Sequence, residues 1–195
     1  MRVIAGTARG VRLAPVPEGT RPVSDRAREG LFSSLGERVT GARVLDLYAG
    51  TGALGLEALS RGAAHAWFVD RSAPAVATIR ENLSRAKLED RATLLREPVR
   101  AALRGHPAGL EDGADLVLVD PPYGLDPEEL RAVLELLRVR LARDGVIVLT
   151  RPKRDHTDVI PVDLQVAKSL TYGDTLVHLI REDPRARERG VPGDV

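Results

Sequence analysis

The sequence contains no cysteine, which excludes disulfide bonds, thiolate chemistry and zinc sites built on cysteine. Aromatic residues make up only 3% of a chain that is 43% hydrophobic, so leucine, valine and alanine must fill its core. No apolar run approaches the roughly 20 residues of a membrane span, and the first ten residues lack the apolar region of a secretory signal. The four histidines show no metal-ligand spacing, so no metal is expected. These absences favour a cytoplasmic protein, and 195 residues suit one domain.

Positive charge gathers at the N-terminus of a chain whose net charge is only +1. Residues 1–28 hold six arginines and two acidic residues. A basic segment in an otherwise near-neutral protein is typical of proteins that bind a polyanion such as nucleic acid. Arginine supplies 26 of the 29 basic residues, however, so a general richness in arginine is an alternative explanation.

From residue 41 onward, apolar segments typical of strands alternate with amphipathic segments typical of helices. This alternation predicts an α/β, Rossmann-like fold with a mostly parallel sheet covered on both faces. Before it, a β-hairpin over residues 2–16 and a helix that begins after Ser24 form an N-terminal extension. We therefore expect an RNA-facing extension over 1–40, a main domain over 41–183 and a disordered tail over 184–195. The seven expected strands lie within 42–50, 64–70, 92–97, 114–120, 146–150, 164–170 and 175–180.

A glycine-rich loop joins the first strand of this domain to the next helix, with Gly50, Gly52 and Gly55 in a G-x-G-x-x-G pattern. Asp70 ends the following strand, 20 residues after Gly50, where an acid can accept hydrogen bonds from ribose. These residues alone fit either NAD or another adenosine cofactor. Asp46 favours the second, because a carboxylate before the loop suits the cationic S-adenosylmethionine better than a diphosphate. The alternative is a tight turn that Asp46 caps locally.

A rigid corner, D-P-P-Y, follows the fourth strand at Asp120, Pro121, Pro122 and Tyr123. The amino nitrogen of a nucleobase is a poor nucleophile, because its lone pair is delocalised into the ring. Hydrogen bonds from the amino group to the Asp120 carboxylate and the Pro121 carbonyl would draw this nitrogen toward sp3 geometry. Tyr123 could stack on a base swung into the site. The alternative is a strand-end turn with a packed tyrosine.

Together, the glycine loop, the D-P-P-Y corner and the N-terminal segment R-P-V-S-D-R-A-R-E-G-L-F resemble the RsmD family of bacterial 16S rRNA guanine-N2 methyltransferases. The resemblance covers residues 2–182 and implies a class I fold, S-adenosylmethionine as cofactor and S-adenosylhomocysteine as product. It implies one guanine of 16S rRNA as target, within the small ribosomal subunit or an assembly intermediate, and we expect a monomer that binds no membrane. The catalytic residues would be Asp120, Pro121, Pro122 and Tyr123. The cofactor would contact Asp46, Tyr48, Gly50, Thr51, Gly52, Asp70, Arg71, Glu97 and Pro98. The RNA would contact Arg9, Arg12, Arg21, Arg26, Arg28 and Lys153.

Some residues leave alternatives open. Glu97 lies where adenine would extend, but a solvated surface glutamate explains it equally well. The family tends to have an acid after the fifth strand, whereas this chain has Thr150 and Arg151 before a basic loop. That loop could contact phosphates or be merely solvated. Three rival functions remain: an N6-adenine methyltransferase, an NAD-dependent oxidoreductase, and an rRNA-binding module without catalysis.

Overall fold

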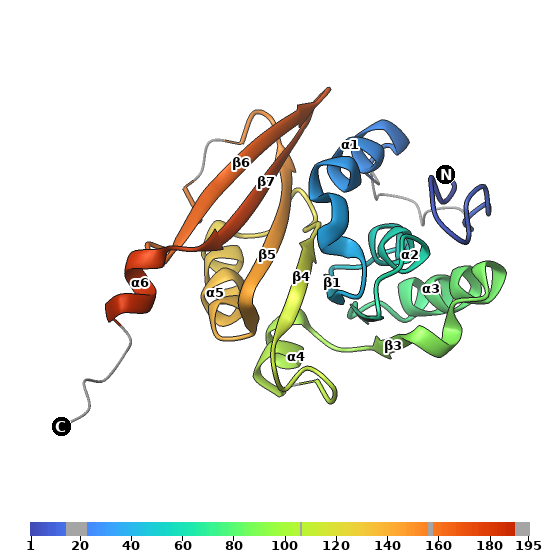
Figure 1. Cartoon of the computed structure of the whole chain (residues 1–195), viewed down its shortest axis with the longest axis horizontal. Coiled ribbons are helices and arrows are strands. Elements are labelled where there is room, and N and C mark those ends of the chain that lie inside the picture. The colour runs from blue at the N-terminus through green and yellow to red at the C-terminus, as the bar shows by residue number, and fades with distance from the viewer. Residues whose placement is uncertain (15–22, 106, 156–157, 190–195) are drawn as a thin grey trace.

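A seven-stranded sheet forms the centre of the computed structural model, which describes residues 1–14, 23–105, 107–155 and 158–189. The strand order is β3-β2-β1-β4-β5-β7-β6 (Figure 1). Strands β1 to β5 run parallel, and β7 pairs antiparallel with both β5 and β6. The predicted mostly parallel α/β sheet is confirmed. The strands are β1 (Arg43–Leu47), β2 (His65–Val69), β3 (Ala92–Leu95), β4 (Ala114–Val119), β5 (Leu141–Pro152), β6 (Leu164–Tyr172) and β7 (Thr175–Glu182).

Helices cover both faces of the sheet, with α1, α2 and α3 on one side and α4 and α5 on the other (Figure 1). The side chains of Ser24, Ser72 and Asp126 cap α1, α3 and α5 by accepting backbone N–H bonds, as expected of these residue types. The helices are α1 (Asp25–Leu35), α2 (Ala53–Ser60), α3 (Ala73–Ala86), α4 (Val99–Gly105), α5 (Pro127–Arg138) and α6 (Pro184–Arg189), with single 3-10 turns η1 (Gly36–Val39) and η2 (Glu89–Arg91).

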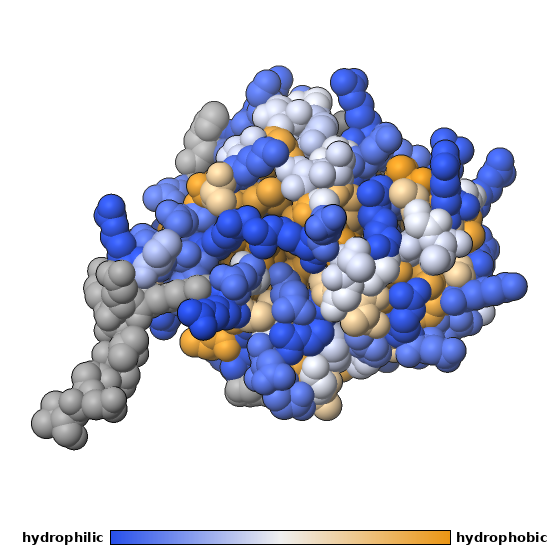
Figure 2. Space-filling view, viewed as in Figure 1, coloured by the Kyte–Doolittle hydropathy of each residue, from blue (hydrophilic) through white to orange (hydrophobic). Residues whose placement is uncertain are grey.

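Two apolar layers form the core, one on each face of the sheet. Leu31 and Phe32 of α1 are buried in the same layer as Val44 of β1 and Leu56 of α2. The N-terminal extension therefore packs into the core of the main domain rather than beside it. On the face shown in Figure 2, hydrophilic side chains surround smaller areas of hydrophobic ones.

Three predicted elements differ in the structure. The N-terminal hairpin has one antiparallel bridge, between Arg2 and Arg12, in place of two strands. The sequence from Asp126 to Gly145 has a helical apolar pattern and predicts one long helix, but α5 ends at Arg138, because residues from Leu141 onward pair with β4 as the first part of β5. The tail predicted to be disordered begins with the six-residue helix α6, in which Ala186 is buried; residues 190–195 lie outside the described part.

Candidate active site

The candidate site lies beyond the carboxyl ends of β1, β2, β4 and β5, where ligands bind in sheets of this kind. Asp46 is the penultimate residue of β1 and is only 1% exposed. Its Oδ2 accepts a hydrogen bond of 2.9 Å from the Gly55 N–H, so the local cap considered from the sequence is present. Burial, above all, raises the pKa of Asp46 well above its ordinary value, and the negative charges of Asp120 and Asp70 raise it further. A cation placed beside Asp46 would relieve this cost.

The glycine loop brings bare backbone to the site. Gly50 and Gly52 have positive φ angles of 58° and 75°, which favour glycine. A Cβ added at Gly50 would meet nothing closer than the Tyr48 carbonyl oxygen at 3.9 Å, so a ligand can approach the loop there. Gly55 is needed for packing instead, since its Cβ would lie 2.3 Å from Phe68 Cε1. The loop is therefore open to a ligand at Gly50 and closely packed at Gly55.

The other residues expected to contact the cofactor surround this loop. Asp70 accepts from the Gly50 N–H at 2.9 Å through Oδ2 and from the Ser72 N–H at 2.8 Å through Oδ1, so it shapes the loop. Tyr48 has a left-handed φ of 57°, and burial and the nearby Glu129 raise its pKa to about 12. Its hydroxyl therefore stays protonated at neutral pH.

Four more of the predicted cofactor residues vary in burial. Thr51 is only 5% exposed, and its carbonyl accepts a bond from the Asn82 side chain. Arg71 is exposed beside Asp70, and Glu97 is partly exposed two residues past β3. Pro98 is exposed and accepts the first N–H bonds of α4 through its carbonyl. These positions border the carboxyl edge of the sheet.

Asp120 follows β4 directly opposite Thr150 of β5, because the register aligns Val119 with Leu149. The Thr150 hydroxyl donates a hydrogen bond to Asp120 Oδ1 and lies 3.4 Å from the Val119 carbonyl oxygen. Burial raises the pKa of Asp120 to about 6, although the Thr150 bond opposes this rise. The carboxylate is thus fixed in orientation and mostly ionised at neutral pH. Thr150 was not among the residues predicted for the site.

The proline corner leaves an aromatic ring in solvent. Tyr123 is 60% exposed, one of the few large apolar side chains with that exposure in the described residues. The Leu125 N–H donates to the Pro122 carbonyl at 2.9 Å, whereas no backbone N–H in the described part of the chain donates to the Pro121 carbonyl. The Asp120 carboxylate and the Pro121 carbonyl are therefore the acceptors that can receive an amino group, with Tyr123 beside them.

The predicted RNA-binding residues divide into two groups. Arg9 and Arg12 on the N-terminal hairpin, and Arg26 on α1, are exposed. Arg28 is fully buried, and its Nη2 donates to the Arg2 carbonyl at 2.6 Å and to Asp25 Oδ1 at 2.7 Å. The prediction that Arg28 faces RNA is wrong for this fold, because its guanidinium ties α1 to the hairpin. Arg21 lies outside the described residues.

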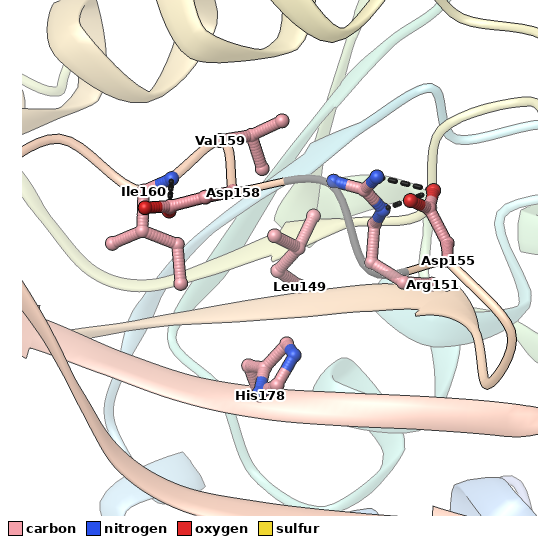
Figure 3. Close-up of a pocket in the computed structure, with 7 residues that line it drawn as sticks. All are labelled: Leu149, Arg151, Asp155, Asp158, Val159, Ile160 and His178. Carbon is pink, nitrogen blue, oxygen red and sulfur yellow. Dashed lines mark hydrogen bonds and ion pairs between the residues drawn. The ribbon is translucent and has the colours of Figure 1, made fainter.

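The basic loop after β5 presents only part of its charge to solvent. Lys153 and Arg154 are exposed, but Arg151 is 8% exposed and forms an ion pair with Asp155. Figure 3 shows this pair at a small pocket that also contains Leu149 and His178. Leu149 belongs to the core layer of α4 and α5, whereas Thr150 points to the opposite face. Arg151 is therefore directed away from Asp120 and is not available to phosphates there.

The residues that the structure describes lack two features. They contain no group of three or more histidine, aspartate or glutamate side chains that could hold a metal ion. None of the helices in that part of the chain has the length and apolar content to cross a membrane.

Known proteins resemble this chain in sequence and in structure. A family model described as "Conserved hypothetical protein 95" matches residues 1–181. "Ribosomal RNA small subunit methyltransferase D" of Escherichia coli is 38% identical over 94% of this chain and 90% of that protein. "Putative rRNA methyltransferase YlbH" of Bacillus subtilis is 37% identical over 93% of this chain and 99% of that protein. A solved structure titled "Putative methyltransferase yhhF" from Escherichia coli has a TM-score of 0.78 and 30% identity, covering 94% of this chain and 98% of that one.

The fold and the family agree with the site geometry. The mostly parallel seven-stranded sheet is that of class I methyltransferases, the fold of these structural neighbours. The chain belongs to the Conserved hypothetical protein 95 family, which is the RsmD family of rRNA methyltransferases.

Proposed function

We propose that the protein transfers a methyl group from S-adenosylmethionine to the N2 amino group of a guanine in 16S rRNA. The observation that carries this proposal is the position of Asp120. Its carboxylate is held by Thr150 at the end of β4 and lies on the same edge of the sheet as the buried Asp46 and the glycine loop. An acceptor for an amino group and a site for a cationic methyl donor thus adjoin each other.

The cofactor would be held mainly by backbone and by acids. Gly50 offers open backbone, Asp70 could accept from ribose hydroxyls, and Asp46 would face the cationic amino-acid end of the cofactor. When bound, S-adenosylmethionine supplies a methyl group whose bonding electrons leave with sulfur, which yields S-adenosylhomocysteine. Tyr48, Thr51, Arg71, Glu97 and Pro98 would line the rest of this site.

The target base would be held by the proline corner. Asp120 and the Pro121 carbonyl would accept the two amino hydrogens and direct the nitrogen lone pair toward the methyl group. Pro122 keeps this backbone stiff, since its φ is fixed. Tyr123 would stack on the base, which contributes about 1–3 kcal/mol in comparable sites. Asp120 can hold one amino proton until water removes it after methyl transfer.

The RNA itself would contact the exposed arginines of the N-terminal segment. Arg9, Arg12 and Arg26 would bind phosphates, and Lys153 would do so from the loop after β5. Such contacts position the RNA and leave the choice of base to the proline corner. The substrate would be the small ribosomal subunit or an assembly intermediate in the cytoplasm, and the enzyme would act as a monomer.

Electrostatics argue against the rival NAD-dependent oxidoreductase. The negative charge of Asp120 already raises the pKa of the buried Asp46. The diphosphate of NAD would add negative charge there, whereas a sulfonium and an ammonium group would neutralise it. Titration with S-adenosylhomocysteine and with NAD distinguishes the two, because we expect heat of binding only with the former.

Methyl transfer itself is tested with labelled S-adenosylmethionine and small subunits from cells that lack the modification. We expect the wild-type protein to label 16S rRNA and the Asp120→Ala variant to lose this activity while it still binds S-adenosylhomocysteine. If the wild-type protein binds subunits without labelling them, it is an rRNA-binding module rather than an enzyme.

A further inference from the structure

A fully buried amide side chain joins the N-terminal hairpin to the glycine loop. Asn82 lies on α3 and is 0% exposed. Its Oδ1 accepts from the Ala14 N–H at 2.7 Å, and its Nδ2 donates to the Thr51 carbonyl at 2.9 Å. A backbone donor on one side and a backbone acceptor on the other allow only this orientation of the amide. Asn82 therefore contacts two segments that are 37 residues apart and belong to different functional parts.

Residues 1–14, which we call the N-terminal arm, are also fixed to α2. The buried carboxylate of Glu57 accepts from the Ile4 N–H at 2.7 Å and from the Ala5 N–H at 3.1 Å. The buried Ser60 hydroxyl donates to the Ala5 carbonyl and accepts from the Ala8 N–H at 2.9 Å. Because α2 begins directly after Gly52, the arm rests on the helix that the glycine loop starts.

Burial makes the Asn82 contacts interdependent. If the arm moved away, Asn82 would lose the Ala14 donor and keep an unpaired buried oxygen, which is costly. If the loop changed shape, Asn82 would lose the Thr51 carbonyl as acceptor and keep an unpaired buried N–H. The same arm carries Arg9 and Arg12, both exposed to solvent.

We propose that Asn82 is a positioning residue that couples docking of the RNA-binding arm to the shape of the cofactor loop. The inference rests on the proposed function, since it assigns RNA to the arm and the methyl donor to the loop. Coupling of this kind is reciprocal, so cofactor binding must strengthen RNA binding by the same factor as RNA binding strengthens cofactor binding.

The test measures this coupling factor as the ratio of two Kd values for unmodified small subunits, one without and one with saturating S-adenosylhomocysteine. For the wild-type protein we expect subunit binding to tighten at least fivefold with S-adenosylhomocysteine. In Asn82→Ala we expect S-adenosylhomocysteine to bind at least fivefold more weakly and the factor to fall below two. Thr78→Ala is the matched control on the same helix, because in the described contacts the Thr78 hydroxyl bonds only to the Pro74 carbonyl of that helix. Its affinity for S-adenosylhomocysteine and its coupling factor should both stay within twofold of wild type.

Asn82→Asp is a second variant that keeps the test decisive if Asn82→Ala fails to fold. It keeps the volume and the acceptor for Ala14 but turns an oxygen toward the Thr51 carbonyl, so it should weaken S-adenosylhomocysteine binding while the arm stays docked. In the wild-type protein, hydrogen exchange of the Ala8 and Ala14 amides should slow at least fivefold when S-adenosylhomocysteine binds.

The inference is overturned if wild-type coupling is below twofold, if Asn82→Ala keeps the wild-type factor, or if the exchange of both amides is unchanged. Failure of the proposed function is a different result, in which the wild-type protein does not bind S-adenosylhomocysteine or does not methylate subunits at all.

Discussion

Replacing Thr150 by valine should shift the pH dependence of methyl transfer toward higher pH. The substitution removes the hydroxyl that donates to Asp120 and keeps a β-branched side chain of nearly the same volume in β5. The ionised carboxylate of Asp120 is the stronger acceptor for the guanine amino group, and only this form can take up an amino proton. Activity therefore falls as the pH drops through the pKa of Asp120, and this pKa decides where the loss occurs.

The magnitude follows from the environment of Asp120. Burial raises its pKa from 3.8 to about 6, even with the Thr150 bond in place. A hydrogen bond to a charged group contributes about 1.5–3 kcal/mol, and about 1.4 kcal/mol corresponds to one pH unit. Loss of the bond should move the midpoint up by about one to two pH units. The electrostatic coupling of Asp120 to Asp46 on β1 is present in both proteins, and Arg151 faces away toward Asp155.

The assay is kcat/KM for small subunits, measured between pH 5 and 9 with saturating S-adenosylmethionine. In the wild-type protein the midpoint of the acidic limb should lie at or below about 6, since the bound sulfonium favours the carboxylate. Thr150→Ser keeps the hydroxyl and should behave like wild type. Equal midpoints for the valine variant and the wild-type protein would refute the role assigned to Thr150.

Three further substitutions test other parts of the site. Asp46→Asn keeps the acceptor for Gly55 and removes a buried ionisable group. Because the pKa of Asp46 is raised in the folded protein, the wild-type protein loses stability as the pH rises through that pKa. At neutral pH the variant should therefore melt about 2–4 °C higher for each ~1 kcal/mol of unfolding free energy that the substitution recovers. It should also bind S-adenosylmethionine at least tenfold more weakly in calorimetry, and unchanged affinity would exclude Asp46 from the cofactor site. Gly55→Ala places a Cβ 2.3 Å from Phe68 Cε1 and should lower the free energy of unfolding, measured in urea, by about 1–3 kcal/mol. Gly105→Ala is the control, because its Cβ would have nothing within 4 Å, and it should change this free energy by less than about 0.5 kcal/mol. Equal effects of the two substitutions would contradict the packing described at Gly55. Tyr123→Ala should reduce kcat/KM for subunits by about tenfold or more and leave S-adenosylhomocysteine binding unchanged. Tyr123→Phe keeps the stacking ring and should keep the activity. An equally large loss of activity in the phenylalanine variant would contradict stacking.

The sheet was predictable because its signals are local. Apolar runs mark all seven strands, and capping residues such as Ser72 and Asp126 fix where helices begin. The end of α5 was not predictable, since the apolar pattern continues past Arg138. Only pairing with β4 decides that residues from Leu141 onward extend into β5.

Within the site, the sequence located residues that lie next to recognisable patterns and missed those that act across the fold. Asp46, Asp120 and the glycines stand at strand ends and could be assigned. Thr150 could have been found by aligning the last residues of the two neighbouring strands. Arg28 looked like an exposed arginine of a basic segment, and only tertiary packing shows that its guanidinium is buried against Asp25.

The identity of the methylated nucleoside tests the central claim most directly. Small subunits from cells that lack the modification are incubated with the protein and labelled S-adenosylmethionine, and the 16S rRNA is digested to nucleosides. Label in N2-methylguanosine, absent when Asp120 is replaced by alanine, is the predicted result. Label in N6-methyladenosine, or no label in rRNA, would contradict the account.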